Sequence, residues 1–359
     1  MRSIATWNAR SAWRLGTLLL IVLSLVSGSS ALAGGPAEYV FQVSVDGLGA
    51  SYLQALITEG RLPNFARLQA EGAWTNNART DFDFTITLPN HTCMVTGRSV
   101  RDKAAMPVAR TGHNWTINID PGSKTLHGNR HDYVPSTFDV AHDHGLRTCM
   151  FASKSKFVLY DQSYDAANGA PDAVAPDNGR DKMDLYVKDG NSSAMTDHFI
   201  SEMREHPFRY SFLHFHDADS AGHSKGWGTP SYNDAVVAVD TCLGRLLAFV
   251  ASDPKFKDKT AIIISADHGG IARDHFDPRN PLDYTIPFYV WGAGVAHGKD
   301  LYSLNTASRQ DPHGDRPDYT DPGLQPIRNG DGGNLALSLL GLPAIPDSSI
   351  NSAQDLKVQ

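Results

Sequence analysis

Short runs of apolar, β-branched and aromatic residues recur along the chain, and segments with a helical pattern lie between them. The strongest runs are YVFQVSV (39–45), YSFLHFH (210–216), TAIIISA (260–266) and IPFYVWG (286–292). Apolar residues return every three or four positions in 63–72, 231–250 and 330–342, which predicts helices there. Apolar strands that alternate with helices favour an α/β fold, in which helices cover both faces of a central, mostly parallel sheet.

Acidic residues follow three of these runs directly. The first run is followed by Asp46-Gly47, the second continues into DADSAGH, and the third continues into DHGG. The functional crevice of an open α/β sheet lies beyond the carboxyl ends of its strands. We therefore expect one edge of the sheet to gather carboxylates, with histidines beside two of them.

These acids and histidines have the chemistry of a metal site. Asp267 and His268 are adjacent, and Asp219 and His223 are four positions apart, so that one helical turn or a tight loop would aim both at one point. Carboxylate oxygens and imidazole nitrogens both suit zinc. A single Asp-His pair is usually a solvated turn, but three clusters that each follow an apolar strand indicate a functional site.

The motifs also resemble those of a known family, in the expected order. VDGLG, TLPNHTCMVTG, DADSAGH and ADHGG are similar to the alkaline phosphatase superfamily, in particular its type I phosphodiesterase and nucleotide pyrophosphatase branch. They extend from residue 40 to about 295, and PIRNGDGGNLALSLLGLP resembles the family's closing helix. The resemblance implies one alkaline-phosphatase-like catalytic domain over residues 34–359. The segment 99–200, rich in Gly, Asp, Asn and Lys, is expected to form long loops and short elements near the site.

The resemblance further implies two divalent metal ions, expected to be Zn²⁺. The ligands of the first ion would be Asp46, Thr87, Asp267 and His268. The second ion would bind Asp219, His223 and a third residue, for which the position shortly before the run 286–292 favours His275. His313 and His297 remain open, because this spacing departs from that of nucleotide pyrophosphatases, whose equivalent histidine lies much farther beyond the DHG motif.

Thr87 is the candidate nucleophile. It stands two residues before Pro89, which suits the first turn of a helix. Coordination to a metal lowers the pKa of an alcohol, and the amino end of a helix favours developing negative charge, so the resemblance implies a phosphothreonine intermediate. The alternative is that Thr87 only caps the helix.

Candidate substrate-binding residues are less specific. In the phosphodiesterase branch an asparagine amide meets a phosphate oxygen from a segment that resembles GHNWTIN, which offers Asn118, the preferred residue, or Asn114. Lys154 and Lys156 follow a β-like run and would reach a substrate phosphate. Both asparagines could equally be loop residues that bond their own backbone, and both lysines could be solvated surface residues.

The sequence therefore predicts a metal-dependent phosphoric ester hydrolase that acts on a small-molecule phosphate ester. Alternatives are a phosphomonoesterase, a phosphonate hydrolase with the same Thr and metals and, outside enzymes, a periplasmic metal- or ligand-binding protein. The sulfatase pattern C/S-x-P-x-R is not present in TITLPNH. Phosphoethanolamine transferases also use a Thr but carry several membrane helices, which the sequence does not predict here.

Residues 1–33 are typical of an export signal, with Arg2, Arg10 and Arg14 before the apolar segment LGTLLLIVLSLV and small residues before Gly34. We expect a periplasmic or secreted protein without stable membrane insertion after cleavage, because no later segment is expected to span. Removing three Arg changes the formal charge from −7 to −10 (29 Lys and Arg against 39 Asp and Glu), which disfavours nucleic-acid polymers. The three cysteines allow one disulfide or none, and the sequence leaves the oligomeric state open.

Overall fold

One sheet of eight strands organises the structure. The computed structural model describes residues 34–102 and 111–359. The strands, in spatial order, are β4 (Leu185–Lys188), β3 (Thr148–Ala152), β5 (Tyr210–Phe215), β1 (Tyr39–Val45), β6 (Thr260–Ser265), β7 (Thr285–Gly292), β2 (Ala73–Arg79) and β8 (Lys299–Asp300). β7 runs antiparallel to both its neighbours, and the other pairs are parallel. The prediction of a mostly parallel sheet is therefore confirmed.

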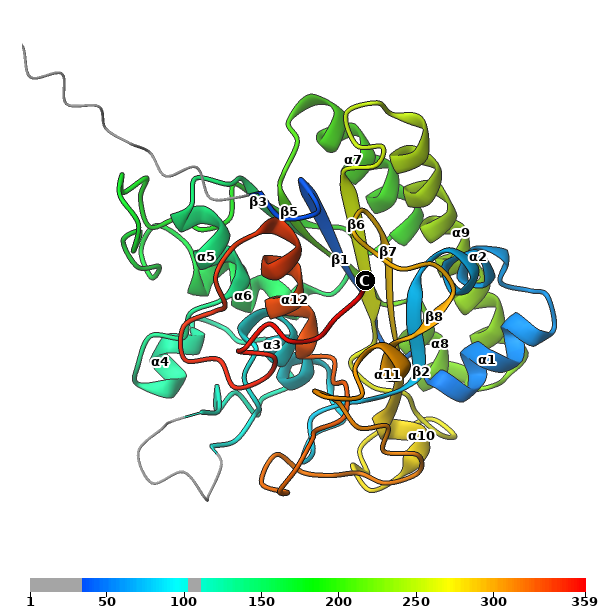
Figure 1. The fold of residues 1–359 in the computed structure, drawn as a ribbon. Helices are drawn as coiled ribbons and strands as arrows, with labels where there is room; N and C mark the ends of the chain where they lie inside the picture. The colour runs from blue at the N-terminus through cyan, green and yellow to red at the C-terminus, as the bar shows by residue number, and fades with distance from the viewer. Residues whose placement is uncertain (1–33, 103–110) are drawn as a thin grey trace, which may run out of the picture. The chain divides into compact units, whose positions relative to one another are not determined.

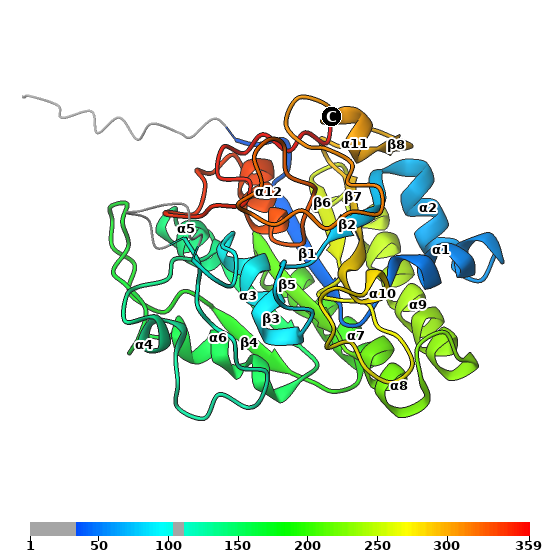
Figure 2. The same cartoon turned by 90° about the horizontal axis from the view of Figure 1, so that it is seen from below.

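Helices cover both faces of this sheet (Figures 1 and 2). One face carries α3 (Thr87–Thr96), α5 (Thr137–Asp143) and α12 (Asp331–Leu340), which contact one another. The opposite face carries α1 (Ala50–Thr58), α2 (Pro63–Glu71), α7 (Ser192–Glu205) and α9 (Pro230–Ser252). The remaining helices are α4 (Leu126–Arg130), the 3-10 turn η1 (Ser155–Phe157), α6 (Val158–Ser163), α8 (Asp217–Lys225), α10 (Pro281–Tyr284) and α11 (Leu301–Leu304).

The central strands are buried throughout, as their unbroken apolar runs predict. Every residue of β1, β5 and β6 is buried, because helices exclude water from both sides. The sequence pattern does not reveal β2, whose residues AWTNNAR are partly polar and whose pairing with β7 contains a bulge between Thr75 and Ala78. The segment 99–200 contains short elements as well as loops, and two of these elements, β3 and β4, belong to the sheet itself.

The longest helix changes one sequence expectation. Within the described residues, α9 is long and apolar enough to cross a membrane, so the expectation that no later segment qualifies is wrong on length and composition. In the structure its apolar side packs against α2, α7 and α8, and residues such as Leu243 and Leu246 are buried there. An amphipathic helix in a protein core passes the same test of length and composition.

Two further predictions concern the cysteines and the amino-terminal segment. Cys93, Cys149 and Cys242 all lie in the described part of the chain and are buried, free thiols. The predicted export signal, 1–33, lies outside the described residues, so its cleavage stays an expectation.

Candidate active site

The carboxyl ends of three adjacent strands meet at the candidate site. β1 lies between β5 and β6, with Val45 opposite Phe215 and Ser44 opposite Ser265, so the segments that follow these strands start side by side. The Asp46 N–H donates to the Phe215 carbonyl at 2.9 Å, and the Asp219 N–H donates to the Asp46 carbonyl at 3.0 Å. The motifs that sequence analysis singled out are thus joined through their backbones.

Asp46, Asp267 and His268 form the first group of candidate ligands, and all three are fully buried. His268 Nε2 lies 3.5 Å from Asp46 Oδ1 and 3.2 Å from Asp267 Oδ2. The other ring nitrogen, Nδ1, lies 2.8 Å from the Gly269 carbonyl and must donate to it, which leaves the lone pair on Nε2. This lone pair therefore faces two carboxylate oxygens.

Asp219, His223 and His275 form the second group. Asp219 and His223 lie one turn apart on α8, and their side chains approach to 3.3 Å. His275 Nε2 lies 3.2 Å from His223 Nε2 and 3.8 Å from Asp219 Oδ1. The Nδ1 atom of His275 faces the Thr85 carbonyl, and the Nδ1 atom of His223 faces the Arg273 carbonyl. The Nε2 atoms of the two rings therefore face each other. The two groups adjoin, because the rings of His268 and His275 stack with centroids 3.6 Å apart.

The structure separates the three candidate histidines for this group. His275 is buried within it, whereas the side chain of His313 is 88% exposed beside Asp311. His297 lines a different pocket, next to Trp291 and Glu71. Only His275, of these three, has a nitrogen within reach of Asp219 among the described contacts.

The residues fit a bound cation, by the test of hydrogen bonding. Four buried acceptor atoms at the centre of the two groups have no hydrogen-bond partner: Asp46 Oδ1, Asp219 Oδ1, Asp267 Oδ2 and His268 Nε2. Buried polar atoms are normally paired, and acceptors that face one another repel unless a positive charge lies between them. Aspartate and histidine are also a suitable ligand set for Zn²⁺.

Lys154 lies inside this site rather than on the surface. Its Nζ atom is 2.7 Å from Asp46 Oδ2 and 2.6 Å from Asp219 Oδ2, so it joins one carboxylate of each group. Burial acts to raise the pKa of Asp46, but Lys154 and the hydrogen bond from His214 hold it well below its usual value. Burial and the charge of Asp46 act to raise the pKa of Asp219, which the adjacent His223 ring and Lys154 nevertheless lower to about 2. The interpretation of Lys154 as a solvated surface residue is wrong.

Asp267 behaves in the opposite way. Burial and the negative charge of Asp46 raise its pKa well above the usual value, although the Gly47 N–H donates to it. Burial lowers the pKa of His275 to about 3, and the neighbouring His268 adds to this shift. Burial thus disfavours the charged forms of both Asp267 and His275.

Thr87 is the first residue of α3 and is buried. The cap position belongs to Ile86, and no side chain forms a cap hydrogen bond, so the alternative that Thr87 only caps the helix is wrong. His91, one turn later, lies with Nδ1 2.8 Å from the Thr87 carbonyl and 3.5 Å from Asp267 Oδ2. Since the Thr85 carbonyl contacts His275, the backbone on both sides of Thr87 is attached to the two ligand groups.

The two candidate asparagines differ in position. Asn118 Oδ1 accepts from the Leu88 N–H at 3.0 Å and from Lys156 Nζ at 2.9 Å, so Asn118 lies at the amino end of α3. Asn114 is not brought to this place. With its amide oriented to satisfy both neighbours, it donates to the Val100 carbonyl at 3.3 Å and accepts from Arg130 at 3.0 Å. Asn114 is therefore a loop residue bonded to its surroundings, the reading that sequence analysis left open.

A comparison with known proteins agrees with this geometry. The sequence profile of the type I phosphodiesterase / nucleotide pyrophosphatase family matches residues 40–280, which include every residue of the two ligand groups described above. The chain belongs to this family. The resemblance seen in the motifs is thereby confirmed, and the family supports a phosphoric ester hydrolase or transferase.

Solved structures show the same fold. Murine ectonucleotide pyrophosphatase / phosphodiesterase 5 is 14% identical, with a TM-score of 0.57, and the match covers 89% of this chain and 99% of that one. The lipoteichoic acid synthase LtaP from Listeria monocytogenes is 12% identical, with a TM-score of 0.54, and the match covers 91% of this chain and 75% of that one. At such low identity these similarities establish the alkaline-phosphatase-like fold alone.

Curated proteins that are similar to this chain include transferases. GPI ethanolamine phosphate transferase 1 from Mus musculus is 24% identical over 274 residues, which are 72% of this chain and 27% of that protein. The Saccharomyces cerevisiae protein of the same name is 37% identical over 86 residues, which are 23% of this chain and 9% of that protein. The matched part of this chain thus spans about a quarter or less of the length of these relatives.

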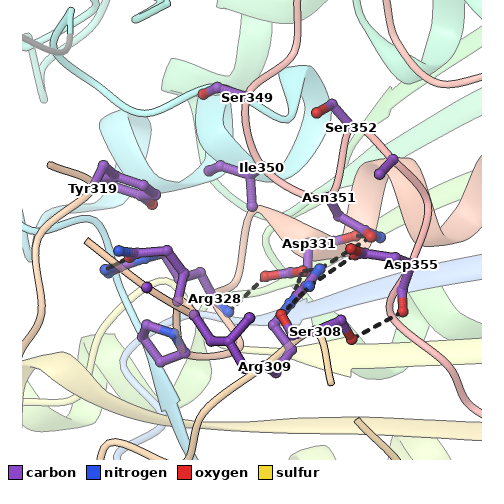
Figure 3. Close-up of a pocket in the computed structure, with 15 residues that line it drawn as sticks. Ser308, Arg309, Tyr319, Arg328, Asp331, Ser349, Ile350, Asn351, Ser352 and Asp355 are labelled. Atoms are coloured by element: carbon purple, nitrogen blue, oxygen red, sulfur yellow. Dashed lines mark hydrogen bonds and ion pairs between the residues drawn. The ribbon is translucent and has the colours of Figure 1, made fainter. Parts of the chain in front are cut away.

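A second pocket, near the carboxyl terminus and shown in Figure 3, is lined by none of these candidate ligands. It has a volume of about 220 Å³ and lies beside the start of α12. Its main charges pair with one another, because Arg309 contacts both Asp331 and Asp355 at 2.8 Å. We interpret this network as an anchor for the carboxyl-terminal segment.

Sequence reasoning missed two buried histidines of the site, His91 and His214, as parts of its framework. His214 Nε2 lies 2.9 Å from Asp46 Oδ2, and His91 Nε2 lies 2.8 Å from Ser44 Oγ. The available signal for His214 was its position, because a histidine within a mostly apolar, buried strand needs a polar partner.

Proposed function

We propose that this protein is an exported, zinc-dependent phosphoric ester hydrolase that prefers diesters and uses Thr87 as its nucleophile. The observation that carries the proposal is the cluster of unpaired buried acceptors in two adjoining Asp-His groups, with the start of α3 attached to both. The family match supports the reaction class. The substrate would be a small-molecule phosphate ester.

The first group, completed by the Thr87 hydroxyl, would hold one Zn²⁺, and Asp219, His223 and His275 would hold the other. When bound, the two ions supply positive charge that lowers the pKa of the attacking hydroxyl and water and that stabilises the leaving oxygen. Both groups follow the carboxyl ends of parallel strands, the edge at which open α/β sheets bind their ligands.

In the first step, Thr87 Oγ1 gives its proton to solvent and forms a bond to phosphorus, while the bond from phosphorus to the leaving oxygen breaks in line with the attack and the leaving oxygen keeps the electron pair. The amino end of α3 and the Lys156 ammonium favour the negative charge of the transferred group. Asn118 lies between these two donors and would orient a phosphate oxygen with its amide. Water then attacks phosphorus, and Thr87 is released.

One solved relative supports the role of Thr87. The murine structure is described as an inactive threonine-to-alanine variant in complex with AMP. A matching role here makes Thr87→Ala the appropriate inactive control and makes nucleotide diesters the first natural substrates to test.

The second candidate function is transfer of a phosphoethanolamine group to an alcohol, which the mouse relative favours. The first step would be the same, and an alcohol would replace water in the second. The expectation that transferases carry membrane helices is no argument against it, because the matched part is only 27% of that relative.

The test compares zinc-loaded wild type with Thr87→Ala on bis-p-nitrophenyl phosphate, p-nitrophenyl phosphate and phosphatidylethanolamine with an alcohol acceptor. Faster Thr87-dependent turnover of the diester supports the proposal. Faster turnover of the monoester would identify a phosphatase instead, and formation of a phosphoethanolamine ester of the acceptor would identify the transferase. Turnover that persists in Thr87→Ala would refute the assigned nucleophile.

Export has a separate test. A protein isolated from the periplasm or the medium should begin at Gly34 if residues 1–33 are removed as proposed. Recovery of the full chain from the cytoplasm would contradict this.

A further inference from the structure

His214 is a buried histidine that contacts the Asp46 carboxylate. His214 lies on β5, directly opposite Ser44 of the neighbouring strand β1, and its side chain is fully buried. His214 Nε2 is 2.9 Å from Asp46 Oδ2. The steps derived above for Thr87 and the phosphate do not involve this residue.

The backbone determines which nitrogen of His214 carries the hydrogen. The Ser153 N–H donates to His214 Nδ1 at 3.3 Å, and the Ser153 hydroxyl lies 3.0 Å from the same atom. A backbone N–H can only donate, so Nδ1 is an acceptor. The hydrogen of the neutral ring is therefore on Nε2, which donates to Asp46.

This arrangement decides how the Asp46 carboxylate is turned. Its Oδ2 atom accepts from His214 and contacts Lys154, whereas its Oδ1 atom has no partner and faces His268 Nε2 at 3.5 Å. The His214 ring cannot easily turn away, because it packs against Phe157 with centroids 4.0 Å apart and against His91 at 4.9 Å.

Asp267 is turned by a comparable device. Its Oδ1 atom accepts from the backbone N–H groups of Gly47 and His268, both at 3.0 Å, and its Oδ2 atom is left unpaired. Each carboxylate of the first group thus has one anchored oxygen and one free oxygen. For Asp46 the neutral anchor is a side chain, which mutation can remove.

We propose that His214 is a positioning residue for the metal group formed by Asp46, Asp267 and His268: it donates to Asp46 Oδ2 and thereby presents Oδ1 to the cation. The inference rests on the proposed function, because it assumes that this group binds zinc. Partners that orient a metal ligand are worth about 10- to 100-fold in metal affinity.

The experiment measures zinc affinity by competition with a chromophoric chelator, without any turnover assay. H214F keeps an aromatic ring between Phe157 and His91 but removes the donor, and H214Q keeps an amide N–H that can reach Asp46. We expect about 10- to 100-fold weaker binding of one zinc ion in H214F, and affinity close to wild type in H214Q. Circular dichroism of the metal-free variants checks that they fold.

Equal zinc affinity in folded H214F and wild type would overturn the inference. If H214F does not fold, ¹⁵N NMR of the His214 ring in wild type decides: a hydrogen on Nε2 supports the inference, and a hydrogen on Nδ1 overturns it. A wild-type protein that binds no zinc would overturn both this inference and the proposed function. If only this inference fails, the wild-type protein still binds zinc and still shows Thr87-dependent turnover.

Discussion

The Nε2 atoms of His223 and His275 lie 3.2 Å apart, although the two residues are separated by 52 positions in the chain. When both rings are neutral, each gives its Nδ1 hydrogen to a backbone carbonyl, so neither Nε2 atom has a hydrogen to share with the other. Two lone pairs at this distance, close to Asp219, require a cation or a proton between them.

This contact leads to a prediction about metal content. His275→Ala should lower the zinc content from about two ions per chain to about one, because three protein ligands are the usual minimum for such a site. Elemental analysis after gel filtration measures this content. His313→Ala is the matched control and should keep both ions, since its side chain is exposed and distant from Asp219. Loss of zinc in the control, but not in His275→Ala, would reverse the assignment.

Lys154 should matter most when no metal is present. Lys154→Met removes the ammonium group that Asp46 and Asp219 share, and breaking a buried ion pair costs about 3 kcal/mol of unfolding free energy. Zinc neutralises the same carboxylates, so most of this loss should disappear in the zinc-loaded protein. Urea denaturation with and without a chelator measures the difference. The exposed Lys257→Met serves as control, and an equal loss in both metal states would contradict the prediction.

Replacing Asn118 and replacing Asn114 should have different effects on kcat/KM. Asn118→Ala should reduce kcat/KM on the diester by about 10- to 100-fold, because an amide that orients the phosphate contributes about 1.4 to 2.7 kcal/mol at the transition state. Asn114→Ala should leave kcat/KM within about twofold, since Asn114 bonds Val100 and Arg130 rather than the site. Steady-state kinetics of both variants test this. A larger effect of the Asn114 variant would assign phosphate binding to Asn114 instead of Asn118.

Asp283 should make the metal-free protein less stable as the pH rises. Burial raises its pKa from 3.8 to about 7, Asp274 and Asp277 add to the shift, and its Oδ1 atom has no hydrogen-bond partner. The folded state therefore binds more protons than the unfolded state between about pH 4 and pH 7, so the free energy of unfolding falls across this range and stays lower above it.

Asp283→Asn should remove that fall. We expect the free energy of unfolding of the variant to equal that of wild type near pH 4 and to be about 1 to 3 kcal/mol higher at pH 8. Chelator-treated protein is used, because metal binding has a pH dependence of its own. If the difference in unfolding free energy between the two proteins is the same at every pH, folding does not change the pKa of Asp283, and the prediction is wrong.

Much of the framework is predictable because it is encoded locally. Mostly apolar runs predicted β1, β5, β6 and β7 to within about a residue at each end, since a strand buried on both faces is rich in apolar residues at successive positions. β2 was missed because its half-buried, partly polar residues break that pattern. The antiparallel direction of β7 is also invisible locally, because a strand has the same side-chain pattern in either direction.

The sequence by itself determined the α/β class, the family and the motif residues Asp46, Thr87, Asp219, Asp267 and His268, because each of these lies within a few positions of a strand or helix end. Only the tertiary structure brought His275, rather than His313 or His297, close to Asp219, separated Asn118 from Asn114, and placed Lys154 and His214 against Asp46. The physical reason is distance: these assignments depend on contacts of about 3 Å between atoms that lie tens to hundreds of residues apart in the chain.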